Sequence, residues 1–132
     1  MIKHLTVNVS GQGLHEFTAQ VEQLVRESGM KEGLCTLFVQ HTSASLLIDA
    51  GHPWPAPLTG ALKRVQFCSG QNCQENEGPD DMPGHIKSAL TATHLGIPIS
   101  GGRLALGTWQ GIYLWEHRHQ RGARQIVVHL GE

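Results

Sequence analysis

Residues 103–117 read RLALGTWQGIYLWEH, and this stretch decides the fold class because both of its faces are apolar. One face would carry Leu104, Leu106, Ile112 and Leu114, and the other Ala105, Trp109, Tyr113 and Trp115. Gly107 and Gly111 interrupt the pattern, which predicts either one long, bent strand or a pair of strands. A strand with one wet face alternates apolar and polar residues, so this pattern predicts a second sheet or another subunit against the second face.

Short apolar or alternating runs elsewhere predict the remaining strands, at residues 5–9, 34–39, 46–48, 97–99 and 125–130. The run at 34–39 is apolar almost without a break, which predicts a strand buried on both faces. Gly101 and Gly102 mark a hairpin turn between two of the strands.

Apolar residues at helical spacing predict two to three helices. The first carries its apolar face from Phe17 to Val25, with Thr18 as its N-cap. Two more are expected at 58–67 and from Met82 onward. Helices set between antiparallel hairpins make an α+β fold, here a two-sheet, mostly antiparallel β-sandwich.

The composition describes one lightly charged globular domain spanning residues 1–132, with 39% hydrophobic and 16% charged residues. A formal net charge of −1 gives no reason to expect a nucleic-acid partner. No stretch approaches the roughly 20 apolar residues of a membrane span and no export signal is evident, so a cytoplasmic protein is expected. Cys68 and Cys73 are spaced C-x4-C without a second cysteine pair, so no zinc site is predicted there.

Two histidines are candidates for chemistry. His41 follows a predicted buried strand and precedes Thr42, Ser43 and Ser45, whose hydroxyls could hold a phosphate or, with the imidazole, a metal. An ordinary serine-rich strand end is the alternative. His85 lies one turn into a predicted helix behind two aspartates, where it could be a metal ligand or a general acid–base. The alternative there is an exposed histidine that pairs with the aspartates.

Two later stretches are candidates for binding. Thr108 and Gln110 lie in the string GTWQG, which predicts a bulge or a close backbone approach, and the Gln110 amide could contact a ligand. A bulge that only turns the strand at a subunit contact is the alternative. Arg118 and Arg124 belong to a charged hairpin at 116–124, whose arginines could hold a phosphate or could form a solvated turn.

Four features together resemble one family from end to end, the small trimeric YjbQ-like proteins. They are HTSASL at 41–46, DDMPGHIKS at 80–88, GRL-x-x-GTWQ at 102–110 and the arginine of the closing hairpin, Arg124. The resemblance implies a homotrimer of two-sheet sandwiches with pockets near the subunit contacts. It also implies a histidine-lined site, sometimes occupied by metal, to which His41 and His85 would contribute.

The activity that the resemblance implies is a weak thiamine-phosphate synthase reaction. It couples a pyrimidine diphosphate to a thiazole phosphate and releases pyrophosphate. A divalent metal, Mg²⁺ or Zn²⁺, and basic groups would stabilise the leaving pyrophosphate, while hydroxyls would position a phosphate. The partners implied are further copies of the chain and a small phosphorylated molecule.

This sequence departs from the family pattern in the middle of the implied site. Residues 49–53 read DAGHP, the predicted helix at 58–67 has neither histidine nor aspartate, and residues 74–77 read QENE where a histidine is usual. A non-catalytic trimeric binding or scaffold protein is therefore the alternative to an enzyme.

Overall fold

The computed structural model describes residues 1–49, 92–119 and 121–132, which form eight strands and one helix. In chain order the elements are β1 (Ile2–Val9), β2 (Gly13–Glu16), α1 (Thr18–Ser28), β3 (Glu32–Val39), β4 (Ala44–Asp49), β5 (His94–Ser100), β6 (Arg103–Leu104), β7 (Gly111–Glu116) and β8 (Gly122–Gly131). The further helices predicted at 58–67 and from Met82 lie outside the described residues.

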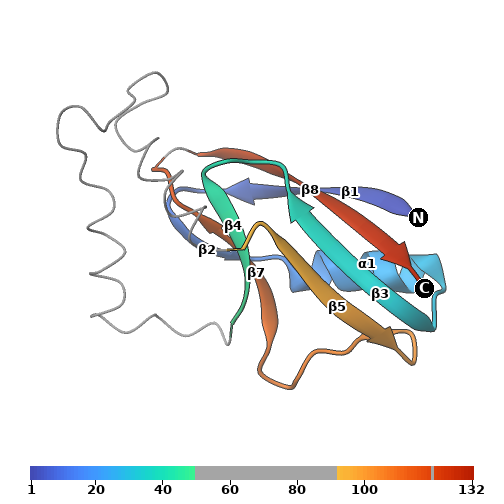
Figure 1. Ribbon diagram of the computed structural model, residues 1–132. Helices are drawn as coiled ribbons and strands as arrows, with labels where there is room; N and C mark the ends of the chain where they lie inside the picture. Colours follow the sequence, from blue (N-terminus) through green and yellow to red (C-terminus); the bar gives the residue numbers. More distant parts are fainter. Residues whose placement is uncertain (50–91, 120) are drawn as a thin grey trace.

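The strands form two antiparallel sheets, a larger one in the order β1-β8-β3-β5-β6 and a smaller one in the order β2-β7-β4 (Figure 1). The helix α1 runs along one face of the larger sheet (Figure 1). The predicted α+β fold with two mostly antiparallel sheets is confirmed. The described part of the chain holds no helix that is long and apolar enough to cross a membrane.

The hydrophobic core is shared by both sheets and the helix. Alternate residues of β3, such as Cys35 and Leu37, are fully buried and belong to one cluster with Val21 of α1 and Leu46 of β4. Burying an aliphatic side chain of this size stabilises a fold by about 1.5–3 kcal/mol. Because this core spans both sheets, it fixes how the ends of β3, β4 and β7 lie relative to one another.

The stretch at 103–117 is a pair of strands, since β6 ends at Leu104 and β7 begins at Gly111. Within β7 the residues from Gly111 to Leu114 are buried in succession, so both faces of this central strand are covered within one chain. Trp109 lies on the turn between the two strands and is 80% exposed. The prediction that Trp109 lies on a strand face is wrong, because the chain turns between Gly107 and Gly111 instead of continuing as a strand.

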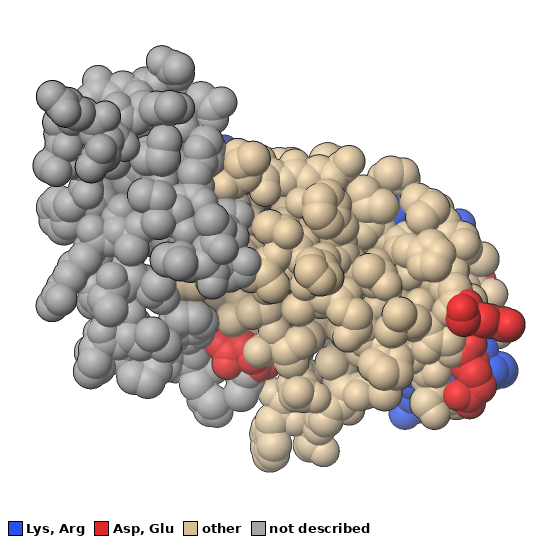
Figure 2. Space-filling view, viewed as in Figure 1, with Lys and Arg blue, Asp and Glu red and all other residues tan. Residues whose placement is uncertain are grey.

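The prediction that residues 34–39 are buried on both faces is wrong for the single chain. On the outer face of β3, Leu34 and Phe38 are 45% and 47% exposed. Phe38 pairs with Val127 and Leu34 with Pro98, which extends this apolar surface across neighbouring strands. Figure 2 shows this side of the molecule almost without charged side chains over β8, β3 and β5. The face left without cover is therefore that of the larger sheet rather than that of β7.

The beginning of α1 differs from the prediction. Its N-cap is Phe17, which makes no side-chain capping bond. The Thr18 hydroxyl instead donates to Glu16 Oε2 at 2.9 Å and accepts from the Ile112 backbone N–H at 2.8 Å, which ties the helix to β7. The preceding strand β2 was not predicted, because its four residues follow glycines and are extended only through pairing with β7.

Candidate functional site

A polar cluster lies where β4 begins and β7 ends. Ala44 pairs with Glu116, and the His117 backbone N–H donates to the Ser43 carbonyl at 3.1 Å, so residues 41–45 lie beside residues 116–118. We call this group the β4–β7 cluster; its members are His41, Ser43, Ser45, Glu116, His117, Arg118 and Arg124. Five of them were predicted as site residues from the sequence, and the strand register brings them together.

His41 closes a tight turn at the edge of the cluster. Its Nδ1 accepts the Ser43 backbone N–H at 2.9 Å. A nitrogen that accepts carries no proton, so the neutral ring assigned from this bond carries its proton on Nε2. A metal ion binds an unprotonated ring nitrogen. In this arrangement Nε2 of His41 is an N–H donor, and the predicted metal binding by His41 stays a prediction.

The two serines of the cluster are fully buried. Ser45 Oγ lies 2.9 Å from His117 Nε2, and the His117 ring packs edge-on against Trp115 with 4.5 Å between ring centroids. Ser43 Oγ is buried and has no hydrogen-bond partner among the described residues. The Ser45 hydroxyl thus holds an imidazole in place inside the protein; direct ligand binding by either serine stays a prediction.

Glu116 is the buried anion of the cluster. Its carboxylate is fully buried and accepts from Arg124 Nε at 2.6 Å and Nη2 at 3.1 Å, as well as from the Arg118 backbone N–H at 3.3 Å. This is the two-pronged arrangement that makes arginine–carboxylate pairs strong. Arg124 Nη1 donates to the Ala123 carbonyl at 3.3 Å. All three guanidinium nitrogens of Arg124 therefore bond protein oxygens, which suits a structural role; its predicted phosphate contact stays untested.

The charges of the cluster sum to a positive value. Arg118 is 6% exposed and Arg124 is 11% exposed, and together they outweigh the single carboxylate of Glu116. The His41 Nε2–H adds a donor, and the exposed Thr42 lies next to it in the turn. Positive charge with N–H donors favours an anion such as phosphate over a cation.

Thr108 and Gln110 lie at the other end of β7. Gln110 Oε1 accepts the Gly107 backbone N–H at 2.7 Å, and the Gln110 backbone N–H donates to the Gly107 carbonyl at 3.0 Å, so the Gln110 amide holds its own turn. The turn precedes β7 and the cluster follows its last residues, a separation of roughly 17 Å along the strand. A single chain therefore does not bring Gln110 and His41 together.

Gly111, the last residue of this string, lies close to side chains of β2, α1 and β7. A Cβ there would lie 2.8 Å from Glu16 Oε2 and 3.2 Å from Thr18 Oγ1. Beside it, the Tyr113 hydroxyl donates to Glu16 Oε1 at 3.4 Å. Burial raises the pKa of Tyr113, and the Glu16 carboxylate raises that pKa further. A side chain at 111 would therefore require the end of the Glu16 side chain to shift.

The described residues do not by themselves fit a divalent metal. They contain no group of three or more histidine, cysteine, aspartate or glutamate side chains that could hold one. The members of the β4–β7 cluster carry a net positive charge, and Nε2 of His41 carries the ring proton. His85 lies outside the described residues, so the predicted pairing of His41 with His85 is not tested.

Glu116 and His117 were not predicted as members of the site. They stand at the start of a string of charged residues, 116–124, which predicts a solvated turn. Their full burial depends on the pairing of β7 with β4 and β2, which the sequence does not state. The available signal was their position at the end of the apolar strand β7, which Glu116 completes and His117 follows.

Comparison with known proteins identifies the family. The family model described as UPF0047 protein YjbQ-like matches residues 3–132. This chain belongs to the YjbQ-like family. A UPF0047 protein of Synechocystis sp. is 47% identical over 130 residues, which cover 96% of this chain and 88% of that protein. The YjbQ protein of Escherichia coli O157:H7 is 37% identical over 131 residues, which cover 97% and 95%.

Solved structures share the fold of this YjbQ-like chain over its whole length. A YjbQ-like protein from Sulfolobus solfataricus, described as being of unknown function, superposes with a TM-score of 0.79 at 26% identity and covers 100% of this chain and 99% of that one. A conserved hypothetical protein from Thermus thermophilus superposes with a TM-score of 0.75 at 30% identity and covers 97% and 98%.

Proposed function

We propose that this YjbQ-like chain forms a homotrimer that binds a small phosphorylated molecule at the β4–β7 cluster. The observation that carries the proposal is that the strand register places Arg118, Arg124 and the His41 ring beside the single carboxylate of Glu116. Phosphate oxygens are bound in proteins by such N–H donors and cations. Among the described residues of the cluster, carboxylates do not outnumber cations, as a site for a cation would require.

The reaction that we propose is the thiamine-phosphate synthase reaction that the family resemblance implies. The thiazole nitrogen would attack the methylene carbon of the pyrimidine diphosphate, and the carbon–oxygen bond to pyrophosphate would break. The electron pair of that bond leaves with pyrophosphate, whose new negative charge is the group to be stabilised. His41, through Nε2–H, and Arg118 are the residues that we assign to this stabilisation. Buried Glu116 and Arg124 would hold the loop that carries Arg118.

A trimeric binding or scaffold protein without catalysis is the second candidate. It is favoured by the way buried members of the cluster bond one another, Ser45 with His117 and Glu116 with Arg124. These four side chains are at most 11% exposed. A general acid or base has to reach the substrate or a bridging water, which these residues do not do in this arrangement.

The trimer proposal rests on the outer face of the larger sheet. Ile2, Leu34 and Phe38 are exposed on it, at 55%, 45% and 47%. Large apolar patches on soluble proteins mark interaction surfaces. Another copy of this chain is the partner that we assign to it, because a face almost without charged side chains can pack against a neighbouring subunit without burying unpaired charges (Figure 2).

The trimer is tested by sedimentation of the full chain and of a Phe38→Ser variant. We expect the mass of three chains for the unmodified protein and a shift to single chains for the variant. Gln20→Ser, a change at an exposed position of α1, is the control and should leave the trimer intact. A single-chain mass for the unmodified protein would contradict the proposal.

The reaction is tested by supplying hydroxymethylpyrimidine diphosphate and thiazole phosphate to the purified protein, with and without Mg²⁺. We expect thiamine phosphate to form and the rate to fall at least tenfold in His41→Ala. Equal product from the two proteins would rule out the catalytic proposal. Saturable binding of pyrophosphate without any product would favour the second candidate instead.

A further inference from the structure

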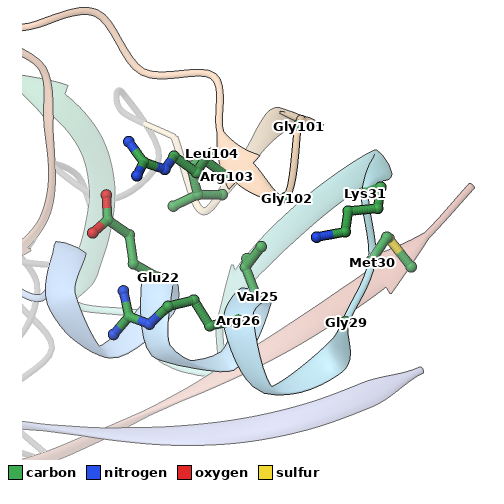
Figure 3. A pocket seen from close by; sticks show the side chains of 10 residues that line it. All are labelled: Glu22, Val25, Arg26, Gly29, Met30, Lys31, Gly101, Gly102, Arg103 and Leu104. Carbon is green, nitrogen blue, oxygen red and sulfur yellow. The ribbon is translucent and has the colours of Figure 1, made fainter.

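A cavity of about 440 Å³ opens between the later turns of α1 and the β5–β6 hairpin (Figure 3). Val25 and Leu104, which are 1% and 7% exposed, form its apolar floor. Small-molecule sites in proteins occupy roughly 300–1,000 Å³, so the volume is suitable for a small ligand. Lys31 precedes β3 and His41 follows it, so the cavity and the β4–β7 cluster lie at opposite ends of that strand, roughly 25 Å apart.

Three cationic side chains and one carboxylate line the cavity, namely Arg26, Lys31, Arg103 and Glu22. They come from three separate parts of the chain. Figure 3 shows Arg103 extending from the hairpin toward the side where Glu22 and Arg26 lie, with Lys31 reaching in from the connection that follows the helix. Three positive charges and one negative charge leave a net charge of two positive. An anion would relieve the repulsion among these cations.

The cations of the cavity are not neutralised within the described part of the chain. Among the described residues, no ion pair joins Glu22 to Arg26, Lys31 or Arg103. Arg26 Nη2 donates a hydrogen bond to Gln23 Oε1 at 2.7 Å, on the exposed side of the helix. Positive charge is therefore available to a ligand in the cavity, in contrast to the paired Arg124.

The hairpin wall of the cavity is held in place by the chain itself. The Gly102 backbone N–H donates to the Lys31 carbonyl at 3.0 Å, and the Gly101 backbone N–H donates to Glu32 Oε1 at 3.3 Å. The φ angle is +60° at Gly101 and +80° at Gly102, values that residues with a side chain rarely adopt. A wall that is already ordered loses little entropy when a ligand binds.

We propose that this cavity binds the phosphoryl group of a small phosphate monoester that carries a hydroxyl group. The Arg103 guanidinium can hold two phosphate oxygens, while Arg26 and Lys31 add positive charge. The Glu22 carboxylate accepts a hydrogen bond from the hydroxyl group of the ester. Its negative charge also disfavours the binding of more highly charged polyphosphates. The site is separate from the proposed catalytic cluster and does not depend on its activity.

The experiment is an NMR titration of the full-length protein with glycerol phosphate at constant ionic strength, followed through backbone amide signals. We expect saturable shifts at Gly101, Gly102 and Arg103. Arg103→Gln should weaken the binding about two- to fivefold, the size expected for one exposed charge. Lys3→Gln removes the same charge from exposed β1 and should leave the affinity unchanged.

Glu22→Gln supplies a test of opposite sign. Inorganic phosphate has no alcohol group that could donate a hydrogen bond to Glu22. The Glu22→Gln variant should therefore bind inorganic phosphate about two- to fivefold more tightly than the unmodified protein, because one repulsive charge is gone. Shifts at residues 101–103 that stay linear, or that sodium chloride reproduces, would overturn the proposal. So would equal weakening by Lys3→Gln and Arg103→Gln. Saturable shifts confined to residues 41–45 and 116–118 would assign phosphate binding to the other cluster and overturn this one.

Discussion

Glu116 and Glu22 both share a small region with arginines, but their surroundings differ. Glu116 is fully buried and bonded twice by Arg124. Glu22 is partly exposed at a cavity with three cations, and no ion pair joins it to them within the described residues. In the first region Glu116 and Arg124 neutralise each other, whereas in the second no carboxylate pairs with the cations among the described residues.

The difference teaches that pairing with a buried carboxylate, as in Arg124, gives an arginine a structural role in this fold. A buried arginine–carboxylate pair offsets the cost of removing charge from water only while both partners are present. An exposed arginine contributes little to stability and stays available to a ligand. The predictions below therefore separate changes that unfold the chain from changes that only alter binding.

The largest expected effect is that of Glu116→Gln. It leaves the Arg124 guanidinium without its anion, which should lower the free energy of unfolding by about 3–5 kcal/mol. Glu22→Gln makes the same chemical change at the cavity and should stay within about 0.5 kcal/mol of the unmodified protein. Urea unfolding at one fixed protein concentration measures both, since an oligomer gains stability with concentration. Equal losses would erase the contrast between the two regions.

The next largest expected effect is a loss of folding stability at high pH. Burial raises the pKa of the Cys35 thiol to about 11, from 9.0. Because the folded chain keeps this proton to higher pH than the unfolded chain, its contribution is fully present below pH 9 and is lost as pH rises toward 11. The loss should approach about 2–3 kcal/mol.

The control for this titration is Cys35→Ala, which should be less stable at neutral pH but should lose less as the pH rises from 9.0 to about 11. Part of the loss should remain, because the pKa of Tyr113 is raised in the same direction. A Cys35→Ala variant with the same pH dependence as the unmodified protein would contradict the assignment to Cys35.

The two serines of the β4–β7 cluster give a smaller and more local test. Ser45→Ala removes the partner of buried His117 and should cost about 1–3 kcal/mol in urea unfolding. Ser43→Ala removes a buried hydroxyl with no bond among the described residues, and should be neutral or stabilising. If Ser43→Ala cost more than Ser45→Ala, the hydrogen bonding described for the cluster would be wrong.

The fold and the candidate site differ in how far the sequence predicts them. Period-two alternation in 5–9 and 125–130 is a local signal, and both segments are strands. The site depends on register, which places Glu116 opposite both Gly13 and Ala44 and buries it. No local pattern states such a pairing. For the same reason the exposure of Phe38 could not be predicted, because an apolar run does not show which of its faces a partner covers.

The cavity at the end of α1 could not be predicted from the sequence either. Arg26, Lys31 and Arg103 are scattered along the chain, and each alone is an ordinary surface cation. They line one cavity because the Gly101–Gly102 turn directs the hairpin back over Lys31. The sequence did predict that turn and a helix end at Gly29, but not that the two lie beside each other.

The central claim is that the β4–β7 cluster is an anion site, and its most direct measurement is a pyrophosphate titration followed through backbone amide signals. We expect saturable shifts at residues 41–45 and 116–118, and at least fivefold weaker binding in His41→Ala. Thr6→Ala, on exposed β1, is the matched control and should bind as the unmodified protein does. Saturable shifts that avoid these residues, or unchanged affinity in His41→Ala, would contradict the claim.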